Sequence, residues 1–168
     1  MAAVCGDGPV PRDASGDRIF TLRIEEVENE IPGGIFVGFV ATPPSQIDFN
    51  DVGNLYDTAA MWRLVGNEIN ANVPINANAP IVSNEINATS QKRLPFARSS
   101  AWSTDQLNRG DELRLVARGG ADGEMQLSAW LNGEVVVQPT QMYLCSFAME
   151  LWPYVAVCGR VGAVRLLV

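Results

Sequence analysis

No histidine occurs among the 168 residues, and this absence removes the commonest designs for catalysis and metal binding. A Ser-His-Asp triad, a Cys-His dyad, an imidazole general base and a histidine-ligated metal site all need the imidazole ring. A catalytic site in this chain would therefore have to be built from carboxylates or thiols.

One acidic stretch has the residue types that glycoside hydrolysis uses, namely two carboxylates that flank the bond to be cleaved. Glu26, Glu28 and Glu30 share one face if the strand that holds them continues to residue 30. The stretch lacks apolar alternation and runs directly into Pro32. A solvated strand end is therefore the favoured interpretation.

A second acidic group could contact calcium. Asp48, Asn50 and Asp51 supply three oxygen ligands, whereas the ion takes about six to eight. We interpret the three residues as an Asx-type turn, and we predict no metal site.

The three cysteines do not suggest a disulfide framework, because their number is odd and no C-x-x-C motif occurs. Cys5 has no base to activate it as a nucleophile. Cys145 and Cys158 lie in apolar stretches and are interpreted as small core residues. We predict no catalytic residue and no cofactor, and the thiols indicate a reducing compartment.

The charge balance excludes a further class of partner. Twelve Lys and Arg against nineteen Asp and Glu give a net charge of −7, whereas non-specific nucleic-acid binding needs a basic surface. No stretch reaches the ~18 apolar residues of a membrane span, and the N-terminus lacks the features of a secretory signal. We expect a cytoplasmic protein with neither a nucleic-acid partner nor a membrane span. The oligomeric state stays open.

Aromatic residues and arginines near loops are the candidates for a binding face, because Trp, Tyr and Arg dominate interface hot spots. Arginines could hold an acidic or amide-rich peptide through forked hydrogen bonds. Six residues at loops or strand ends form the candidate ligand-binding set: Tyr56, Trp62, Arg63, Arg98, Trp102 and Tyr143. The alternative is partial core burial for each tryptophan and ordinary solvation for each arginine.

Short strands and Gly/Pro turns must position these residues. Residues 18–27 alternate between apolar and polar side chains, as a half-buried strand does. Residues 35–41 form an apolar run of the length expected of a hairpin partner, and Gly38 indicates a bulge or a close backbone approach. Residues 61–65 are predicted as a short strand, and Ser103 to Gln106 as a capping box on one helical turn.

The C-terminal half is patterned most clearly. Strands are predicted at 111–118, 124–131, 134–138, 154–158 and 163–168, with the last two as a pair. Asn132 and Gly133 predict a two-residue type I′ turn. Trp130 is out of phase with the apolar residues of its strand, so it faces the second sheet or solvent, whereas Trp152 is predicted to be core.

Two segments stand apart from this pattern. Residues 1–16 are rich in Gly, Pro and Asp and are predicted to be flexible, so the domain is expected to span 17–168. Residues 66–91 are rich in Asn and Ala and repeat Asn-Glu-Ile-Asn-Ala, and we interpret them as a tolerated surface insertion or an Asn-rich binding loop. No stretch shows sustained helical periodicity. The fold class is therefore an all-β, antiparallel sandwich.

Four stretches resemble SPRY domains and, more closely, the neuralized homology repeat. They are residues 18–27, the segment Gly34-Ile-Phe-Val-Gly-Phe-Val-Ala-Thr-Pro-Pro44, Gly110 to Leu113 with the hairpin at 123–133, and residues 151–159 with 164–167. The insertion has no counterpart in that family, and Ala156 stands where the neuralized repeat often has Asp. The family domain usually begins with a further strand, so this chain is expected to leave one sheet edge uncovered.

The resemblance implies a concanavalin-like sandwich of two sheets that acts as a non-enzymatic module and binds a protein or short peptide through loops at one end. It also implies use as the substrate-recognition part of a ubiquitin-ligase system. Two alternatives stay open. One is a lectin-like carbohydrate-binding sandwich, and the other is a structural or assembly subunit that pairs through its open edge.

Overall fold

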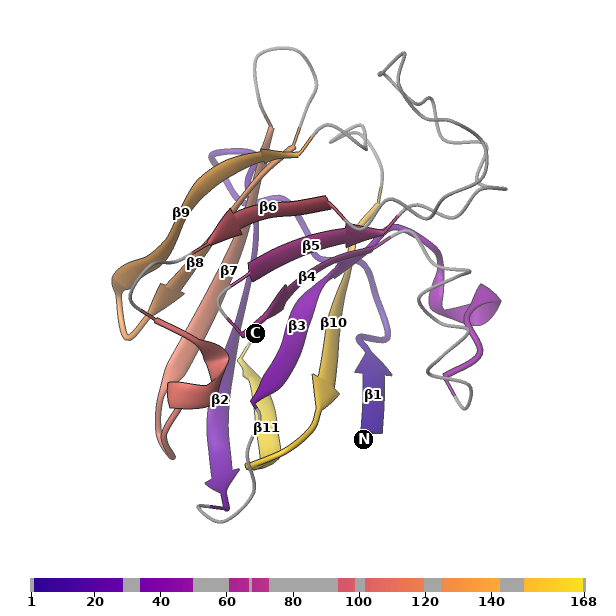
Figure 1. The fold of residues 1–168 in the computed structure, drawn as a ribbon. Helices are drawn as coiled ribbons and strands as arrows, with labels where there is room; N and C mark the ends of the chain where they lie inside the picture. Colours follow the sequence, from indigo (N-terminus) through magenta and orange to yellow (C-terminus); the bar gives the residue numbers. More distant parts are fainter. Residues whose placement is uncertain are drawn as a thin grey trace.

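The computed structural model describes residues 2–28, 34–49, 61–66, 68–72, 94–98, 102–119, 125–142 and 150–167, and for β5 and β6 it describes the backbone alone. These residues contain no α-helix and form two antiparallel sheets (Figure 1). The six-stranded sheet has the order β1 (Ala2–Cys5), β10 (Trp152–Val157), β3 (Ile35–Val40), β4 (Met61–Val65), β5 (Glu68–Asn72), β6 (Leu94–Arg98). The five-stranded sheet has the order β11 (Val161–Leu167), β2 (Arg18–Val27), β7 (Glu112–Gly119), β8 (Met125–Leu131), β9 (Glu134–Met142).

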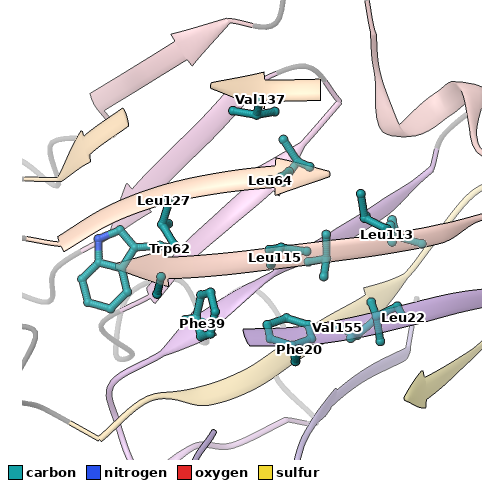
Figure 2. Close-up of a cluster of buried hydrophobic side chains, with 14 of the residues drawn as sticks. Phe20, Leu22, Phe39, Trp62, Leu64, Leu113, Leu115, Leu127, Val137 and Val155 are labelled. Atoms are coloured by element: carbon teal, nitrogen blue, oxygen red, sulfur yellow. The ribbon is translucent and has the colours of Figure 1, made fainter. Parts of the chain in front are cut away.

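The main core lies between the two sheets, because β2, β3, β4, β7 and β8 turn alternate apolar residues inward. Figure 2 shows a cluster of these side chains, and its labelled residues come from both sheets. Phe20 of β2 meets Phe39 of β3 edge to face, with ring centroids 5.0 Å apart. This contact joins the sheets with the geometry that aromatic pairs prefer.

The predicted strand positions are confirmed throughout the described part of the chain, and so is the all-β sandwich. Short 3-10 turns occur at η1 (Pro44–Gln46) and η2 (Thr104–Gln106). At η2 the Ser103 hydroxyl accepts from the Asp105 N–H while the Gln106 side chain accepts from the Ser103 N–H, so the predicted capping box is present. Asn132 and Gly133 both have positive φ, 51° and 88°, as the predicted type I′ turn requires.

Two predicted strand pairings are wrong, because strands close in sequence belong to different sheets. β2 pairs with β7 and β11, whereas its expected partner β3 pairs with β4 and β10. β10 and β11 were expected to pair, yet they lie in opposite sheets. A short connection can lead the chain across a sandwich as readily as along one sheet, and the alternation within a strand is the same in both cases.

The N-terminal segment, predicted to be flexible, contributes to both sheet and core. Ala2–Cys5 forms β1 and pairs with β10, so the edge expected to be uncovered has a neighbour. Val10 is 4% exposed, and its N–H donates to the Leu151 carbonyl over 2.7 Å. The strand Ala2–Cys5 is short and shows no apolar–polar alternation, so its sequence carries little β signal of its own.

The predicted insertion also differs from the structure at its start. Glu68–Asn72 forms β5, which pairs with β4 on one side and β6 on the other. Asparagine has a low strand propensity, so the composition pointed to a loop, and pairing on two sides overrides that preference. Residues 73–91 of the predicted insertion lie outside the described residues.

Candidate binding surface

Over β10, β3 and β4, the outer face of the six-stranded sheet carries a second buried cluster. Val40, Met61, Tyr154 and Ala156 point away from the main core and form a second buried cluster with Ile47. Phe36, Phe49, Ala3 and Cys5 pack against this cluster. Ile47 and Phe49, in the segment after β3, thus cover part of this face.

The outer face of the five-stranded sheet is different, since several of its side chains are open to solvent. On three neighbouring strands, Ile19 lies opposite Val116, and Val116 lies opposite Ser128. Two residues away on the same face of β7, Arg114 lies directly opposite Trp130. Directly opposed side chains are close enough to act together, so this register places a cation, an indole and aliphatic groups side by side.

These side chains line a hollow of about 200 Å³, named here the Trp130 hollow. Its apolar lining is Ile19, Val116, Trp130 and Pro139, and its polar lining includes Arg114, Gln126 and Ser128. An apolar hollow with a few convergent polar groups is the usual form of a binding site.

A bidentate ion pair closes one side of the Trp130 hollow. Arg118 Nε lies 3.1 and 3.0 Å from the two carboxylate oxygens of Asp17, and its Nη2 lies 2.6 Å from Oδ2. This hydrogen bond raises the pKa of Arg118 above its ordinary value, and the nearby charge of Asp17 adds to the effect. Asp17 is buried, so its carboxylate is committed to Arg118 rather than to a ligand.

Trp130 is held in place within the hollow. Its indole Nε1 donates to the Ser128 hydroxyl over 3.3 Å, which fixes the ring along β8. Trp130 is half-buried, so part of the ring is left for contact with a ligand. A rigid, amphipathic ring of this kind loses little conformational entropy on binding.

A second hollow adjoins the first across Ile19 and Arg114, which line both. It has a volume of about 540 Å³ and is named here the proline hollow, after Pro9, Pro11 and Pro153 in its wall. Its remaining apolar lining includes Phe20 and Leu166.

The N-terminal wall of the proline hollow is tied to the sandwich by hydrogen bonds. Gly6 N–H donates to the Pro153 carbonyl over 3.0 Å, and the buried Arg18 donates from Nη1 to the Val10 carbonyl over 2.6 Å. Proline has a fixed φ and no backbone N–H. Pro9 and Pro11 therefore restrict the backbone conformation of this wall and leave no donor that needs an acceptor. The hollow is therefore built from backbone that is held in place.

Two residues of the predicted ligand-binding set, Trp62 and Arg63, are buried and so do not face a ligand. Trp62 is fully buried between the sheets, where Figure 2 shows it among the core side chains. Arg63 is 9% exposed and lies on the opposite face of β4, with its guanidinium 5.6 Å from the centre of the Phe36 ring. Strand alternation sends these neighbours to opposite faces, and both faces of β4 are covered.

The other four predicted residues are not brought together by the described part of the chain. Trp102 is partly buried and packs against the main core. Arg98 ends β6, of which only the backbone is described. Tyr56 and Tyr143 lie outside the described residues.

Sequence reasoning missed the residues of the two hollows, although one signal was present. The phase of Trp130 already separated it from the core face of β8. Ile19 and Arg114 gave no comparable signal, because only the pairing of β2, β7 and β8 brings them to Trp130.

The described thiols and carboxylates form no reactive group. Burial raises the pKa of Cys5 to about 12 and also raises that of Cys158, whose thiol donates to the Gly34 carbonyl over 3.2 Å. Within the described ranges, no three Cys, Asp or Glu side chains are grouped as a metal site would need. No helix among the described residues has the length and apolarity to cross a membrane.

Comparison with known proteins identifies the fold. No protein-family model matches the sequence, and the search of curated proteins finds no match. The crystal structure of the Drosophila melanogaster neuralized NHR1 domain matches with a TM-score of 0.58 and 13% identity, over 99% of this chain and 80% of that chain. The solution structure of the NHR domain in Neuralized from Drosophila melanogaster gives 0.52 and 15%, over 98% and 73%.

A human SPRY domain gives a TM-score of 0.49 at 17% identity, over 98% of this chain and 82% of that chain. The two neuralized matches show that this chain has the fold of a neuralized homology repeat, the SPRY-type β-sandwich. At such low identity the likeness concerns the fold, and function must be argued from the site.

Proposed function

We propose that this chain is a non-enzymatic module that binds a protein or peptide partner, and that the Trp130 hollow is its binding site. The observation that carries the proposal is the register that sets Arg114 beside Trp130 on a sheet face that is open to solvent. Aromatic residues and arginines are the side chains most enriched at interface hot spots. The fold supports the proposal, because it is that of the neuralized homology repeats.

Two finer statements belong to the same proposal. The module is the substrate-recognition part of a ubiquitin-ligase system, as the resemblance to neuralized-type repeats implies, and it acts in the cytoplasm. Tyr56, Arg98 and Tyr143 remain predicted contacts of the partner. Co-purification of a ubiquitin ligase with the tagged protein from cells tests the first statement, and a purification that repeatedly lacks any ligase contradicts it.

A photo-crosslinking amino acid placed in the hollow tests the proposed site directly. Gln126 lines the hollow, whereas Glu134 is an exposed position at the turn end of the same sheet and lines neither hollow. We expect a discrete protein to be crosslinked in cells through position 126 and not through position 134. Failure to crosslink any protein at 126, or equal crosslinking at both positions, would contradict the proposed site.

A glycan array distinguishes the lectin-like alternative. Binding of a saccharide that is lost in a Trp130→Ala variant would replace the peptide-binding proposal. Because Trp130 is half-buried, the variant must keep the wild-type circular dichroism spectrum for the comparison to count.

A further inference from the structure

The two hollows form one continuous surface rather than two separate sites. Ile19 and Arg114 line both hollows, so a ligand in one lies against the same two side chains as a ligand in the other. An extended peptide advances about 3.3 Å per residue and points successive side chains to opposite sides. Neighbouring residues of such a peptide could therefore use both hollows.

The proline hollow offers the apolar part of this surface. Ile19 and Leu166 at its wall are 36% and 40% exposed, and they are two of the three large apolar side chains that the described residues expose most. Three prolines and Phe20 complete an apolar lining. Covering these side chains with an apolar group removes their surface from water, which is favourable.

Arg114 provides the charged part. Its partner on β8 is the uncharged Trp130, and within the described ranges it makes no ion pair. Arg118 is already bound by Asp17, so the charge that faces a ligand is that of Arg114. Two arginines and one aspartate give this surface a charge of +1 in a protein whose net charge is −7.

The charged hydrogen-bonding group of this surface favours a carboxylate. Arginine is a donor only, with a planar fork that matches a carboxylate, which is an acceptor only. The carboxylate oxygens of Asp17 are already occupied by Arg118. Gln126 and Ser128 both donate and accept, so the charge of Arg114 is what distinguishes a carboxylate from a neutral sugar hydroxyl. Charge complementarity therefore selects an acidic peptide over a neutral saccharide.

We propose that the joined hollows bind an extended acidic peptide segment of a partner protein. An aspartate or glutamate of the peptide pairs with Arg114, and an apolar side chain within about three residues of it enters the proline hollow. This inference rests on the proposed function, because it names the chemistry of the peptide that the same face binds.

Short synthetic peptides with free side chains but blocked ends test the charge requirement. Each carries one glutamate and one leucine at a varied spacing, and a matched set carries glutamine in place of glutamate. By fluorescence polarisation we expect the best glutamate peptide to bind about tenfold more tightly than its glutamine counterpart, the scale of one charge-assisted hydrogen bond. Equal affinity of the two sets overturns the proposal.

Protein variants assign the effect to Arg114. Arg114→Gln should remove the preference for glutamate, whereas Arg23→Gln should keep it, since Arg23 is exposed on the same sheet face but lines neither hollow. Both substitutions remove one positive charge, so a general charge effect would appear in both. Equal loss of the glutamate preference in the two variants contradicts the assignment.

A second pair of variants tests the apolar part. Leu166→Asn should weaken binding of the leucine peptides about tenfold, and Val4→Asn, at the exposed aliphatic residue of β1, should leave it unchanged. Unchanged binding in Leu166→Asn overturns this half of the proposal. If the glutamate preference is absent but a protein still crosslinks through position 126, this inference fails while the proposed function stands.

Discussion

At the scale of single residues, two arginines on outward-facing sheet positions have opposite surroundings. Arg63 lies over the Phe36 ring and is buried on the outer face of the six-stranded sheet. Arg114 lies on the open face of the other sheet and is exposed. The same residue type is thus a packing element in one layer and a candidate for ligand contact in the other.

Burial also lowers the reactivity of the Cys5 thiol, because it raises the pKa of that thiol. Its pKa of about 12 lies well above the ordinary 9.0, so at pH 8.5 the folded protein holds far less thiolate at this position than the unfolded chain. We expect iodoacetamide to alkylate Cys5 far more slowly in the native protein than in guanidinium chloride, as measured by mass spectrometry of the N-terminal peptide.

The raised pKa of Cys5 also predicts how the stability of the protein changes with pH. Since the folded pKa is raised, the contribution of Cys5 to stability is fully present below pH 9 and is lost as the pH rises toward 12. A Cys5→Ala variant should lose less stability than the wild type across that alkaline range. Rapid native-state alkylation at pH 8.5 would show that Cys5 is not shielded as the structure has it.

At the scale of elements, the pairing of β3 with β4 depends on Gly38. A Cβ atom at this position would overlap the carbonyl oxygen of Trp62 and lie 2.7 Å from the Cα of Arg63. These are backbone atoms and cannot move aside alone. We therefore expect Gly38→Ala to lower the free energy of unfolding by ~4 kcal/mol or more in urea denaturation, the scale of the most disruptive single substitutions.

Gly8→Ala is the matched control for Gly38→Ala. A Cβ atom at Gly8 meets nothing within 4 Å, and its backbone does not require glycine. The change should be within about 0.5 kcal/mol, as for ordinary surface substitutions. Similar losses in the two variants would mean that the close approach of β3 and β4 is not what makes Gly38 necessary.

The turn between β8 and β9 combines two functions in Asn132. Its positive φ of 51° suits the turn, and its side chain accepts from the Glu112 N–H and donates to the Asp111 carboxylate, both over 2.9 Å. Asn132→Gly still adopts a positive φ readily but loses both hydrogen bonds. Asn132→Ala loses both hydrogen bonds and also disfavours a positive φ. We expect losses of about 1 kcal/mol for Gly and about 2 kcal/mol for Ala in thermal or urea unfolding.

Comparison of the two variants separates the hydrogen bonds from the backbone preference. An Asn132→Gly protein as stable as the wild type would show that the contacts to Asp111 and Glu112 add nothing. An Asn132→Ala protein no less stable than Asn132→Gly would show that the positive φ carries no cost in this turn.

At the scale of the whole molecule, the sequence predicts the sandwich because its information lies in local alternation and turns. The phase of Phe20, Leu22 and Ile24 and the Asn132-Gly133 turn need no knowledge of distant residues. The assignment of strands to sheets depends on long-range pairing, so the positions of β3 and β11 were not predictable in the same way. The edge strand β1 was missed because a short strand with little alternation gains its structure from its neighbour β10.

The site was harder to predict than the fold for the same reason. Trp62 looked like a surface anchor because a predicted loop precedes it, and only the second sheet buries it. Arg114 and Ile19 are separated by most of the domain in sequence, yet the pairing of β2 with β7 and of β7 with β8 joins them to Trp130. A binding surface built across strands has no contiguous motif, so it is visible only once the register is known.

The overall charge and the local charge of the proposed surface act on an acidic peptide at different distances. The net −7 repels such a peptide at long range, whereas Arg114 attracts its carboxylate at contact. The Debye length falls from about 30 Å at 0.01 M salt to about 10 Å at 0.1 M, so added salt weakens the long-range repulsion most. We therefore expect the association rate constant of a glutamate peptide to rise by about two- to threefold over this range in stopped-flow fluorescence. The matched glutamine peptide should show a smaller change. An association rate constant of the glutamate peptide that falls with added salt would contradict this expectation, because it would show that the positive charge of Arg114 dominates the long-range electrostatics of association.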